Sequence, residues 1–296
     1  MPPNDWMVTS QLVQYIVSGI TMGSIYAIVG LGFTIIYSVT GIINFAQGEF
    51  VMLGAMIGFS LLGLGLPLAA AVVISVVLVT VVGIVFNLVA IQPARRASTI
   101  GLIIITIGGT LFIRALAGLY WGRDAVPLPA FTGEQSLRFL GAYIQPQSLW
   151  VIGVTLVLMA GVYVLLNRTL IGKALKAAAI NRRAAALVGI DARRMSLISF
   201  GLAAALGAIG GLVMAPLSFA SHDMGVMLGL KGFVAAAMGG FTGVWGVLLG
   251  GLGLGLAESF AAGYISSAYK DAIALLFLFA VLLIRARSLV AGEEGS

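Results

Sequence analysis

The sequence predicts an all-α fold, a polytopic helical bundle embedded in a membrane. Composition, the length of the apolar runs and the distribution of charge all point to it. The 296 residues are 60% apolar and 9% charged, whereas soluble domains carry about 25% charged residues. The apolar runs are about 20 residues long, which suits a membrane-spanning helix and not a barrel strand. In lipid the backbone must satisfy its own polar groups, so helices are the expected elements.

Positive charge gathers in one segment of the chain. Seven of the 16 Lys and Arg lie between Arg168 and Arg194. Basic loops between membrane spans stay on the cytoplasmic side. We therefore expect residues 167–195 to form a cytoplasmic loop of a single transmembrane domain that covers residues 1–296. The net charge of +6 then reflects topology, and we do not expect nucleic-acid binding.

The apolar runs predict six spans that alternate from an outside N-terminus. They cover residues 12–36, 42–62, 66–91, 98–120, 148–166 and 195–215. The first contains Gly19 and Gly23, a spacing of small residues that lets another helix approach closely. Residues 122–147 form the longest outside loop, which is too short for a separate domain. We expect Pro216 to end the sixth span and residues 217–230 to lie outside.

The last third of the chain is rich in glycine. A final span at 272–284 precedes Arg285 and Arg287, so an odd number of crossings must connect it to the outside segment. Either three crossings occur, with 228–241 as a short or broken helix, or the glycine-rich part is re-entrant. We expect about eight or nine spans. The glycines serve close helix packing or mark a broken helix on a transport pathway, and the candidate pathway positions among them are Gly239, Gly240 and Gly243.

Polar side chains also occur inside apolar runs. Asn44, Gln47 and Glu49 lie in the inner half of the second run, where a charged group costs about 2.5–3.5 kcal/mol. These residues either bond to a neighbouring helix or line a translocation pathway. The same alternatives hold for Glu258, which could pair with Lys231. For His222 we expect a surface role in an outside turn.

The basic loop has the pattern of a short helix. At 100° per residue, Lys173, Lys176 and Arg183 fall on one face, and the alanines between them allow close packing. Gly189 is expected to end or bend this helix. The loop either serves topology alone or binds a cytoplasmic partner through an ordered helix.

Several classes of chemistry are excluded or disfavoured. The chain has no cysteine and one histidine, so thiol catalysis is excluded and a histidine-based metal site is not expected. We predict no catalytic residues and no metal. The phosphate-binding pattern Gly-x-x-x-x-Gly-Lys-Ser/Thr does not occur, so we expect no nucleotide site in this chain.

At this point the chain resembles a known family. Arg183, Ala184, Ala185 and Gly189 have the spacing of the coupling motif Glu-Ala-Ala-x-x-x-Gly of ABC-importer permeases, with Arg183 in place of Glu. TGIINFAQGEFVMLGA at 40–55 and LKGFVAAAMGGFTGVWGVLLGGLGLGLAES at 230–259 resemble segments of branched-chain amino-acid ABC permeases, the LivH/LivM class. Length and N-terminal sequence favour a LivH-type subunit. The motifs recur in order over nearly the whole chain.

The resemblance implies a transport subunit in a bacterial inner membrane and not an enzyme. It implies a second, related permease subunit in a heterodimer, two cytoplasmic ATPase subunits and a periplasmic binding protein that delivers Leu, Ile or Val. ATP would be bound by the partner subunits, and no cofactor is expected here. The residues that would couple to the ATPases are Lys173, Lys176, Arg183, Ala184, Ala185 and Gly189.

Three alternatives remain open at this stage. Related importers for urea or short amides share the same motifs. A secondary transporter or channel working alone would need ion-coupling carboxylates within the membrane, for which Glu49 and Glu258 are the candidates. An intramembrane enzyme would need paired catalytic groups, and no His pair or Asp pair occurs in a predicted span.

Overall fold

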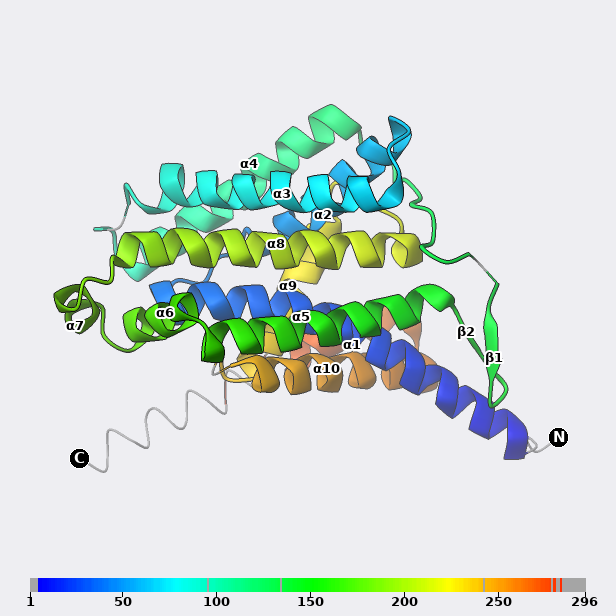
Figure 1. Cartoon of the computed structure of the whole chain (residues 1–296). Coiled ribbons are helices and arrows are strands. Elements are labelled where there is room, and N and C mark those ends of the chain that lie inside the picture. The colour runs from blue at the N-terminus through cyan, green and yellow to red at the C-terminus, as the bar shows by residue number, and fades with distance from the viewer. Residues whose placement is uncertain are drawn as a thin grey trace, which may run out of the picture.

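The computed structural model describes residues 5–94, 96–133, 135–241, 243–277, 279–280 and 283, without the side chains of 5–8 and 268. Within them, six helices are long and apolar enough to cross a membrane. They lie side by side along one direction (Figure 1). These are α1 (Asp5–Thr40), α3 (Leu68–Phe86), α4 (Thr99–Trp121), α5 (Pro146–Arg168), α8 (Ala192–Ser218) and α10 (Val244–Tyr264). The predicted polytopic helical bundle is confirmed.

Two shorter apolar helices complete the bundle, namely α2 (Gln47–Gly63) and α9 (Met224–Met238). The prediction was about eight or nine spans, whereas six of the described helices are long and apolar enough to cross a membrane and these two are shorter. The predicted last span begins as helix from Lys270, and part of it lies outside the described residues. So do Arg95, Arg285 and Arg287, which supported the predicted orientation.

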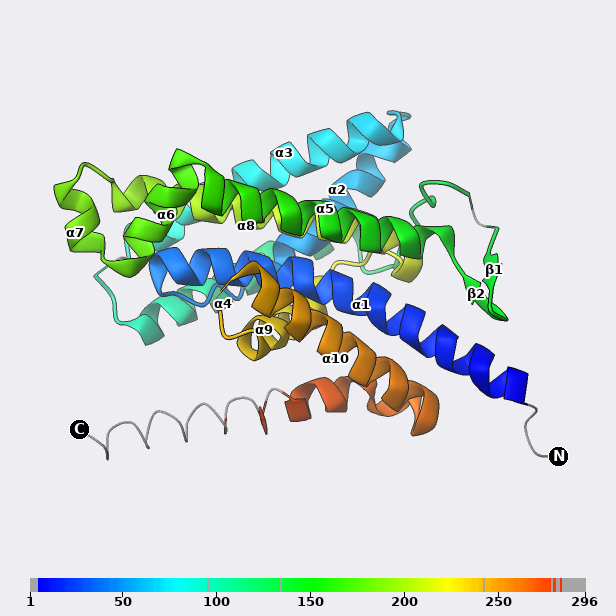
Figure 2. The same ribbon diagram turned by 60° about the horizontal axis from the view of Figure 1, so that its bottom comes forward.

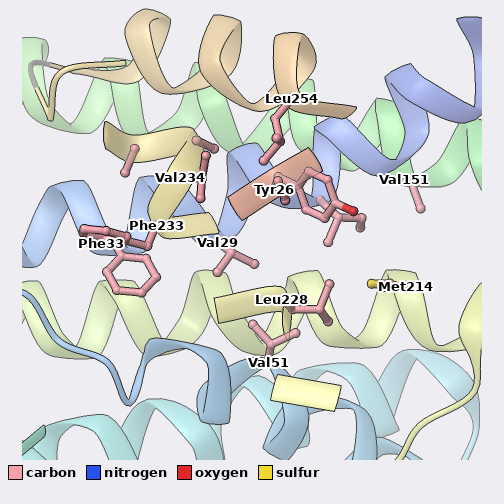
Figure 3. Close-up of a cluster of buried hydrophobic side chains, with 14 of the residues drawn as sticks. Tyr26, Val29, Phe33, Val51, Val151, Met214, Leu228, Phe233, Val234 and Leu254 are labelled. Carbon is pink, nitrogen blue, oxygen red and sulfur yellow. The ribbon is translucent and has the colours of Figure 1, made fainter. Parts of the chain in front are cut away.

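The centre of the bundle is formed by α1 and α8. In an apolar 18-residue stretch of α1, 89% of the residues are buried, whereas the figure is 17% in α4 and 22% in α5. The side chains of Tyr26 and Phe33 on α1 pack with Leu228 on α9 and Leu254 on α10 (Figure 3). The peripheral helices expose long apolar faces, which suits contact with lipid.

The two ends of the bundle differ in structure. At one end lie α6 (Leu170–Ile180) and α7 (Arg182–Leu187), which we call the basic end. At the opposite end, β1 (Leu137–Phe139) and β2 (Ala142–Ile144) pair antiparallel, and we call this the hairpin end (Figure 1). The all-α prediction missed this hairpin. Its two turn residues have positive φ, 48° at Leu140 and 83° at Gly141, as a tight two-residue hairpin turn requires.

Three predicted boundaries were wrong. The second helix begins at Gln47 and not at residue 42, because residues 41–46 are irregular after Gly41, whose φ is +69°. The sixth span runs past Pro216 to Ser218. There the missing proline N–H removes only one bond in the last turn. Residues 217–230 are not an outside loop, since only residues 219–223 separate α8 from α9.

The third span changes its helical geometry near its end. After Phe86 the chain forms a π-helical turn, Asn87–Ile91. The buried Asn87 side chain donates to Ser196 Oγ on α8 at 2.8 Å and accepts from Gln92 Nε2 at 3.1 Å. The bond to Ser196 fixes the end of this span against α8 next to the basic end.

Candidate transport pathway and coupling site

The two short helices begin side by side inside the bundle. A Cβ atom at Gly48, in the first turn of α2, would overlap the carbonyl oxygen of Gly225 in the first turn of α9. A Cβ atom at Gly229 would lie 3.1 Å from the Cα of Gly48. Only glycine permits this approach of the two backbones, and it explains why the sequence carries glycine at these positions.

From this meeting point the short helices run to opposite ends of the bundle. Near the end of α2, Ser60 Oγ accepts a hydrogen bond of 2.6 Å from Nε1 of Trp121, the last residue of α4. Just after α9, the ring of Phe241 lies 4.7 Å from that of Tyr37 near the end of α1. The helix N-termini, which carry partial positive charge, therefore meet in the interior. Interrupted helices of this kind line pathways in several transporter folds.

The predicted pathway residues Asn44, Gln47 and Glu49 are all fully buried around the start of α2. Gln47 Nε2 donates to the carbonyl of Ala203 on α8 at 2.9 Å, and Asn44 Oδ1 accepts from the N–H of Ala46 at 3.2 Å. These two residues hold the irregular entry to α2 in place. The other polar atoms of these side chains, Asn44 Nδ2 and Gln47 Oε1, are buried without a partner among the described residues.

Glu49 differs from its neighbours. Neither of its carboxylate oxygens has a hydrogen-bond partner among the described residues, so the alternative of a bond to a neighbouring helix is not realised here. The charges that act on it most are Arg114 on α4 and Asp223 before α9. Glu49 also lies in the first turn of α2, where the helix N-terminus favours negative charge.

The loop between α8 and α9 contributes two polar side chains to this region. Ser221 Oγ donates to Asp223 Oδ1 at 2.6 Å, which holds the pKa of the Asp223 carboxyl below its usual value. His222 was expected on the surface, but it is half-buried against Gly118 of α4, and its Nδ1 atom is buried without a partner among the described residues.

The predicted glycines lie elsewhere. Gly239, Gly240 and Gly243 belong to the turn between α9 and α10. The φ angles are +78° at Gly240 and +151° at Gly243, and the backbone of Gly239 contacts that of Gly246. At 1.5 Å per residue, α9 separates this turn from the start of α2 by about 20 Å. The structure therefore does not bring the two sets of predicted pathway residues together.

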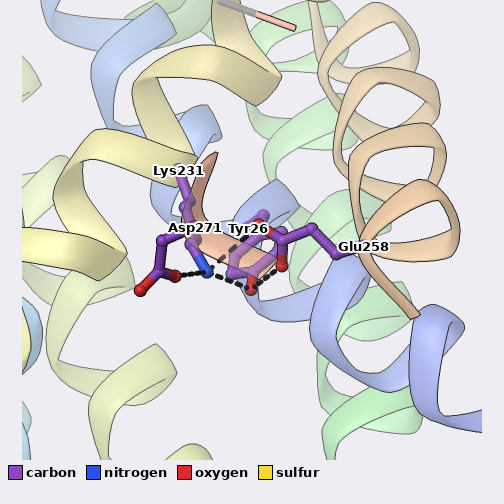
Figure 4. A network of polar contacts seen from close by, with 4 residues as sticks. All are labelled: Tyr26, Lys231, Glu258 and Asp271. Atoms are coloured by element: carbon purple, nitrogen blue, oxygen red, sulfur yellow. Dashed lines mark hydrogen bonds and ion pairs between the residues drawn. The ribbon is translucent and has the colours of Figure 1, made fainter. Parts of the chain in front are cut away.

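An ionic cluster joins four segments of the chain, and of its members only Asp271 is exposed (Figure 4). Lys231 on α9 is 5% exposed, and its Nζ atom lies 3.0 Å from Glu258 Oε1 on α10 and 2.8 Å from Asp271 Oδ1. The hydroxyl of Tyr26 on α1 donates to Glu258 Oε2 at 2.7 Å. Lys231 and Glu258 form the ion pair that the sequence analysis suggested, so Glu258 has a structural partner. Sequence reasoning missed Tyr26 and Asp271, because no local pattern connects positions so far apart.

At the basic end, the predicted single helix is broken in two. Asn181 adopts an extended conformation between α6 and α7, and its Oδ1 atom accepts 3.0 Å hydrogen bonds from the N–H groups of Arg183 and Ala184. Asparagine in this position caps a new helix. Lys173, Lys176 and Arg183 therefore do not share one helical face. Lys176 Nζ donates to Asn167 Oδ1 at the end of α5, at 2.6 Å.

Gly189 ends α7, as predicted. Its φ is +85°, and its N–H donates to the carbonyl of Ala186 at 3.1 Å. The N–H of Ile190 donates to the carbonyl of Ala185 at 3.0 Å. This pair of bonds is the Schellman arrangement, which requires a left-handed residue at the glycine position.

The most direct link between the basic end and the core is a residue that sequence reasoning passed over. Arg182 donates from Nη2 at 2.8 Å and from Nε at 3.2 Å to the carbonyl of Val39, in the last turn of α1. A cation is favoured at this helix end, because the last carbonyls lack partners within the helix. Its neighbour Arg183 has the same charge, so composition alone does not distinguish them.

The surface of the basic end combines charge with exposed apolar groups. Ala185 is buried beneath α7, whereas Lys173, Arg183 and Ala184 are exposed. Three large apolar side chains point into solvent beside them, namely Ile180, Leu187 and Val188, each at least 74% exposed. An exposed apolar patch rimmed by charge is typical of a protein-binding surface.

Comparison with known proteins decides the family. A family model described as "Branched-chain amino acid transport system / permease component" matches residues 15–284. The chain belongs to this permease family. The predicted resemblance is thereby confirmed, and with the apolar helices it makes the chain a multi-pass membrane protein.

Several relatives align over most of the chain. LivH of Escherichia coli (strain K12), a "high-affinity branched-chain amino acid transport system permease protein", is 30% identical over 95% of this chain and 96% of its own length. BraD of Pseudomonas aeruginosa has the same description, identity and coverage. The ribose import permease RbsC of Escherichia coli is 26% identical over 88% of this chain and 82% of its own.

One solved structure also aligns with this permease. It is titled "PsaBC from Streptococcus pneumoniae in complex with Fab" and covers 94% of this chain and 91% of its own, at 12% identity and a TM-score of 0.47. This likeness is too low to support an argument about the site.

Proposed function

We propose that this permease is the membrane-spanning subunit of an ATP-driven importer of leucine, isoleucine and valine in a bacterial inner membrane. The observation that carries the proposal is the family match over residues 15–284, together with 30% identity to LivH over almost the full length of both chains. The likeness to the ribose permease is lower and covers less of each chain.

The proposed assembly has four kinds of component. This chain pairs with a second, related permease subunit. Two ATPase subunits bind the basic end, where the apolar side chains around α7 and the exposed Lys173 and Arg183 form the contact surface. A periplasmic binding protein delivers the amino acid at the hairpin end. ATP binds to the ATPase subunits, because this chain carries no Gly-x-x-x-x-Gly-Lys-Ser/Thr sequence.

The coupling route follows from the contacts of the basic end. Gly189 and Asn181 fix the two ends of α7, so a push from an ATPase moves α7 as one unit. Arg182 passes this motion to the last turn of α1 through its two hydrogen bonds to Val39. From there residues 41–46 lead into α2. The roles of Lys173, Lys176, Arg183, Ala184 and Ala185 are to bind or accommodate the ATPase.

The proposed pathway passes the meeting point of α2 and α9. Movement of α1 shifts the irregular segment before α2, which is held to α4 by the hydrogen bond from the N–H of Phe45 to Thr106 Oγ1 at 3.2 Å. This displaces Gly48 from Gly225 and opens the interior next to Glu49. The turn with Gly239, Gly240 and Gly243 serves as the hinge at the other end of α9.

Transport by this chain alone has less support. A secondary transporter needs a carboxylate that is free to bind the coupling ion within the membrane. Glu258 is already held by Lys231 and Tyr26, so only Glu49 remains of the two candidates. Urea and short amides remain the competing substrates of an importer with the same architecture.

Uptake measurements test the proposed substrate class. In cells that lack other branched-chain amino-acid uptake, expression of this permease with its neighbouring ATPase and binding-protein genes is expected to give uptake of labelled leucine, isoleucine and valine. Labelled urea and acetamide should not accumulate above the level of cells without the transporter. Uptake of urea or acetamide with no uptake of leucine would overturn the proposal.

A further inference from the structure

A small cavity lies at the basic end, between α6 and the helices of the core. Its volume is about 260 Å³, the space of about nine water molecules in the liquid, so it suits a ligand of about that many heavy atoms. Its walls are formed by α1, the end of α5, α6 and the turn before α10. In Figure 2 the first turn of α10 lies across α1, at the end of the bundle that carries α6. In the proposed coupling route, the end of α1 and the turn before α10 are segments that move.

One wall of this cavity carries a buried hydroxyl group without a partner. The α1 side of the cavity follows the spacing of one helical face, with Leu31, Thr34, Ile35 and Ser38. Thr34 is 4% exposed, and its Oγ1 atom has no hydrogen-bond partner among the described residues. Buried hydroxyl groups are normally bonded, because an unpaired one costs free energy. An oxygen atom of a ligand in the cavity would accept a hydrogen bond from Thr34.

The other polar groups around the cavity favour an anion. Lys176 lines its exposed side and uses one of three N–H donors on Asn167 Oδ1, at 2.6 Å. Gly243 and Val244, at the start of α10, also line it. No side chain of the described residues caps this helix, and a Cβ atom at Gly243 would meet no atom within 4 Å. An uncapped helix N-terminus favours negative charge. No acidic side chain lines the cavity in the described part of the chain.

The remaining walls are aliphatic or aromatic. They come from α1, α5, α6 and the region around the start of α10, with Leu31, Ile35, Leu166, Leu175, Phe241 and Val244. Such walls suit the hydrocarbon part of a ligand and disfavour a fully hydrated ion such as phosphate. The chemistry that fits is therefore a short aliphatic monocarboxylate. A zwitterionic amino acid fits less well, because its ammonium group would find no acidic partner in these walls.

We propose that this cavity binds a short aliphatic monocarboxylate from the cytoplasm and that the bound ligand slows transport. The 2-oxo acid with the carbon skeleton of leucine, 4-methyl-2-oxopentanoate, has this size and charge. The ligand contacts α6, α1 and the turn before α10 together, so it stabilises the present conformation against the coupling motion. The slowing of leucine transport rests on the proposed function, whereas binding does not depend on what the transporter carries.

Inhibition from the cytoplasmic side is the first test. The complete transporter is reconstituted in proteoliposomes with ATP inside, on the ATPase side, and takes up labelled leucine that the binding protein delivers from outside. Enclosed with the ATP at millimolar concentration, 4-methyl-2-oxopentanoate should lower initial uptake roughly fivefold or more. The same compound outside should not. Enclosed isoamylamine, which has the aliphatic group but a cation, and enclosed leucine should inhibit roughly tenfold more weakly. Equal inhibition by either would overturn the proposal.

Thr34→Val removes the buried hydroxyl and keeps the shape of the side chain. Uptake without inhibitor should be unchanged, and the concentration for half-inhibition should rise roughly tenfold, the loss expected for one hydrogen bond to a charged group. The control is Thr21→Val, because Thr21 is a buried threonine of the same helix outside the cavity, and its hydroxyl donates to the carbonyl of Val17 at 2.8 Å. This control should leave the half-inhibition concentration unchanged. Equal inhibition of Thr34→Val and the unchanged transporter would contradict the proposed site.

A second measurement leaves Thr34 in place. Because the chain has no cysteine, Ala179→Cys puts a single thiol of this subunit in the cavity wall. In the complete transporter in lipid nanodiscs, 4-methyl-2-oxopentanoate should slow the reaction of this thiol with a small maleimide roughly threefold or more. The reaction of Arg123→Cys, an exposed position outside the cavity, should not change. Equal rates at position 179 with and without the 2-oxo acid would also overturn the site.

The two measurements separate this inference from the proposed function. If the transporter imports leucine but the 2-oxo acid neither inhibits uptake nor protects position 179, the site is wrong and the importer assignment stands. If position 179 is protected but no leucine is taken up, the proposed function fails and the site remains.

Discussion

Lys231→Met is expected to lower the free energy of unfolding by about 3–5 kcal/mol, the usual cost of removing one partner from a buried ion pair. The substitution leaves Glu258, which is 1% exposed, without its cation. It also releases Asp271 and so detaches the C-terminal helical segment from α9. The measurement is denaturant unfolding of the purified protein in detergent, followed by tryptophan fluorescence.

Two further variants locate the cause of this loss. Arg193→Met removes an exposed cation and should change stability by less than about 0.5 kcal/mol. Combining Lys231→Met with Glu258→Met removes both charges, and it should recover a large part of the loss, since replacing a whole buried pair by apolar groups is often close to neutral. If Lys231→Met were as stable as Arg193→Met, the cluster would not hold these helices together.

Arg182→Ala is expected to uncouple ATP hydrolysis from transport. The variant loses both hydrogen bonds to the carbonyl of Val39, while α7, its Asn181 cap and its Gly189 end remain. The ATPases should still bind and hydrolyse ATP, but the number of leucine molecules transported per ATP should fall about tenfold, equivalent to about 1.4 kcal/mol of lost coupling. ATP hydrolysis and leucine uptake are measured together in proteoliposomes.

The control for this experiment is Arg193→Ala, because Arg193 is an exposed arginine of the same end with no contact to α1 in the proposed route. Arg193→Ala should transport as many leucine molecules per ATP as the unchanged transporter. Arg182→Lys keeps the charge but cannot donate two hydrogen bonds in the guanidinium geometry. Its number of leucine molecules per ATP should lie between those of Arg182→Ala and the unchanged transporter. A normal ratio in Arg182→Ala would exclude this residue from the coupling route.

The fold was predictable where the sequence signal is local. Runs of apolar residues located five of the six long helices, all except α10 in the glycine-rich part, and Gly189 predicted the end of α7 because a left-handed residue is needed there. The hairpin was missed, since Leu140 and Gly141 are not a typical turn pair and no alternating strand pattern precedes them. The start of α2 was placed at residue 42 and not at Gln47, because residues 42–46 are apolar enough to belong to a helix.

The candidate site was harder to predict than the fold. Asn44, Gln47 and Glu49 stood out as polar residues in an apolar run, and all three are buried at the start of α2. The sequence does not show which residue each polar or charged group contacts. Lys231 and Asp271 meet only through the packing of helices distant in sequence, and the bonds of Arg182 to the carbonyl of Val39 distinguish it from Arg183. Such long-range contacts have no periodic signature.

Accessibility of the basic end tests the central claim most directly. Ile180→Cys at the basic end and Tyr143→Cys at the hairpin end each place a single thiol in the chain at an exposed position, since the replaced residues are 87% and 61% exposed. In intact cells a membrane-impermeant maleimide should label position 143 and not 180. In inside-out vesicles stripped of ATPase it should label 180, and rebinding the ATPase should block that reaction. Labelling of position 180 in intact cells would contradict a basic end that faces the cytoplasm and receives force from ATPase subunits.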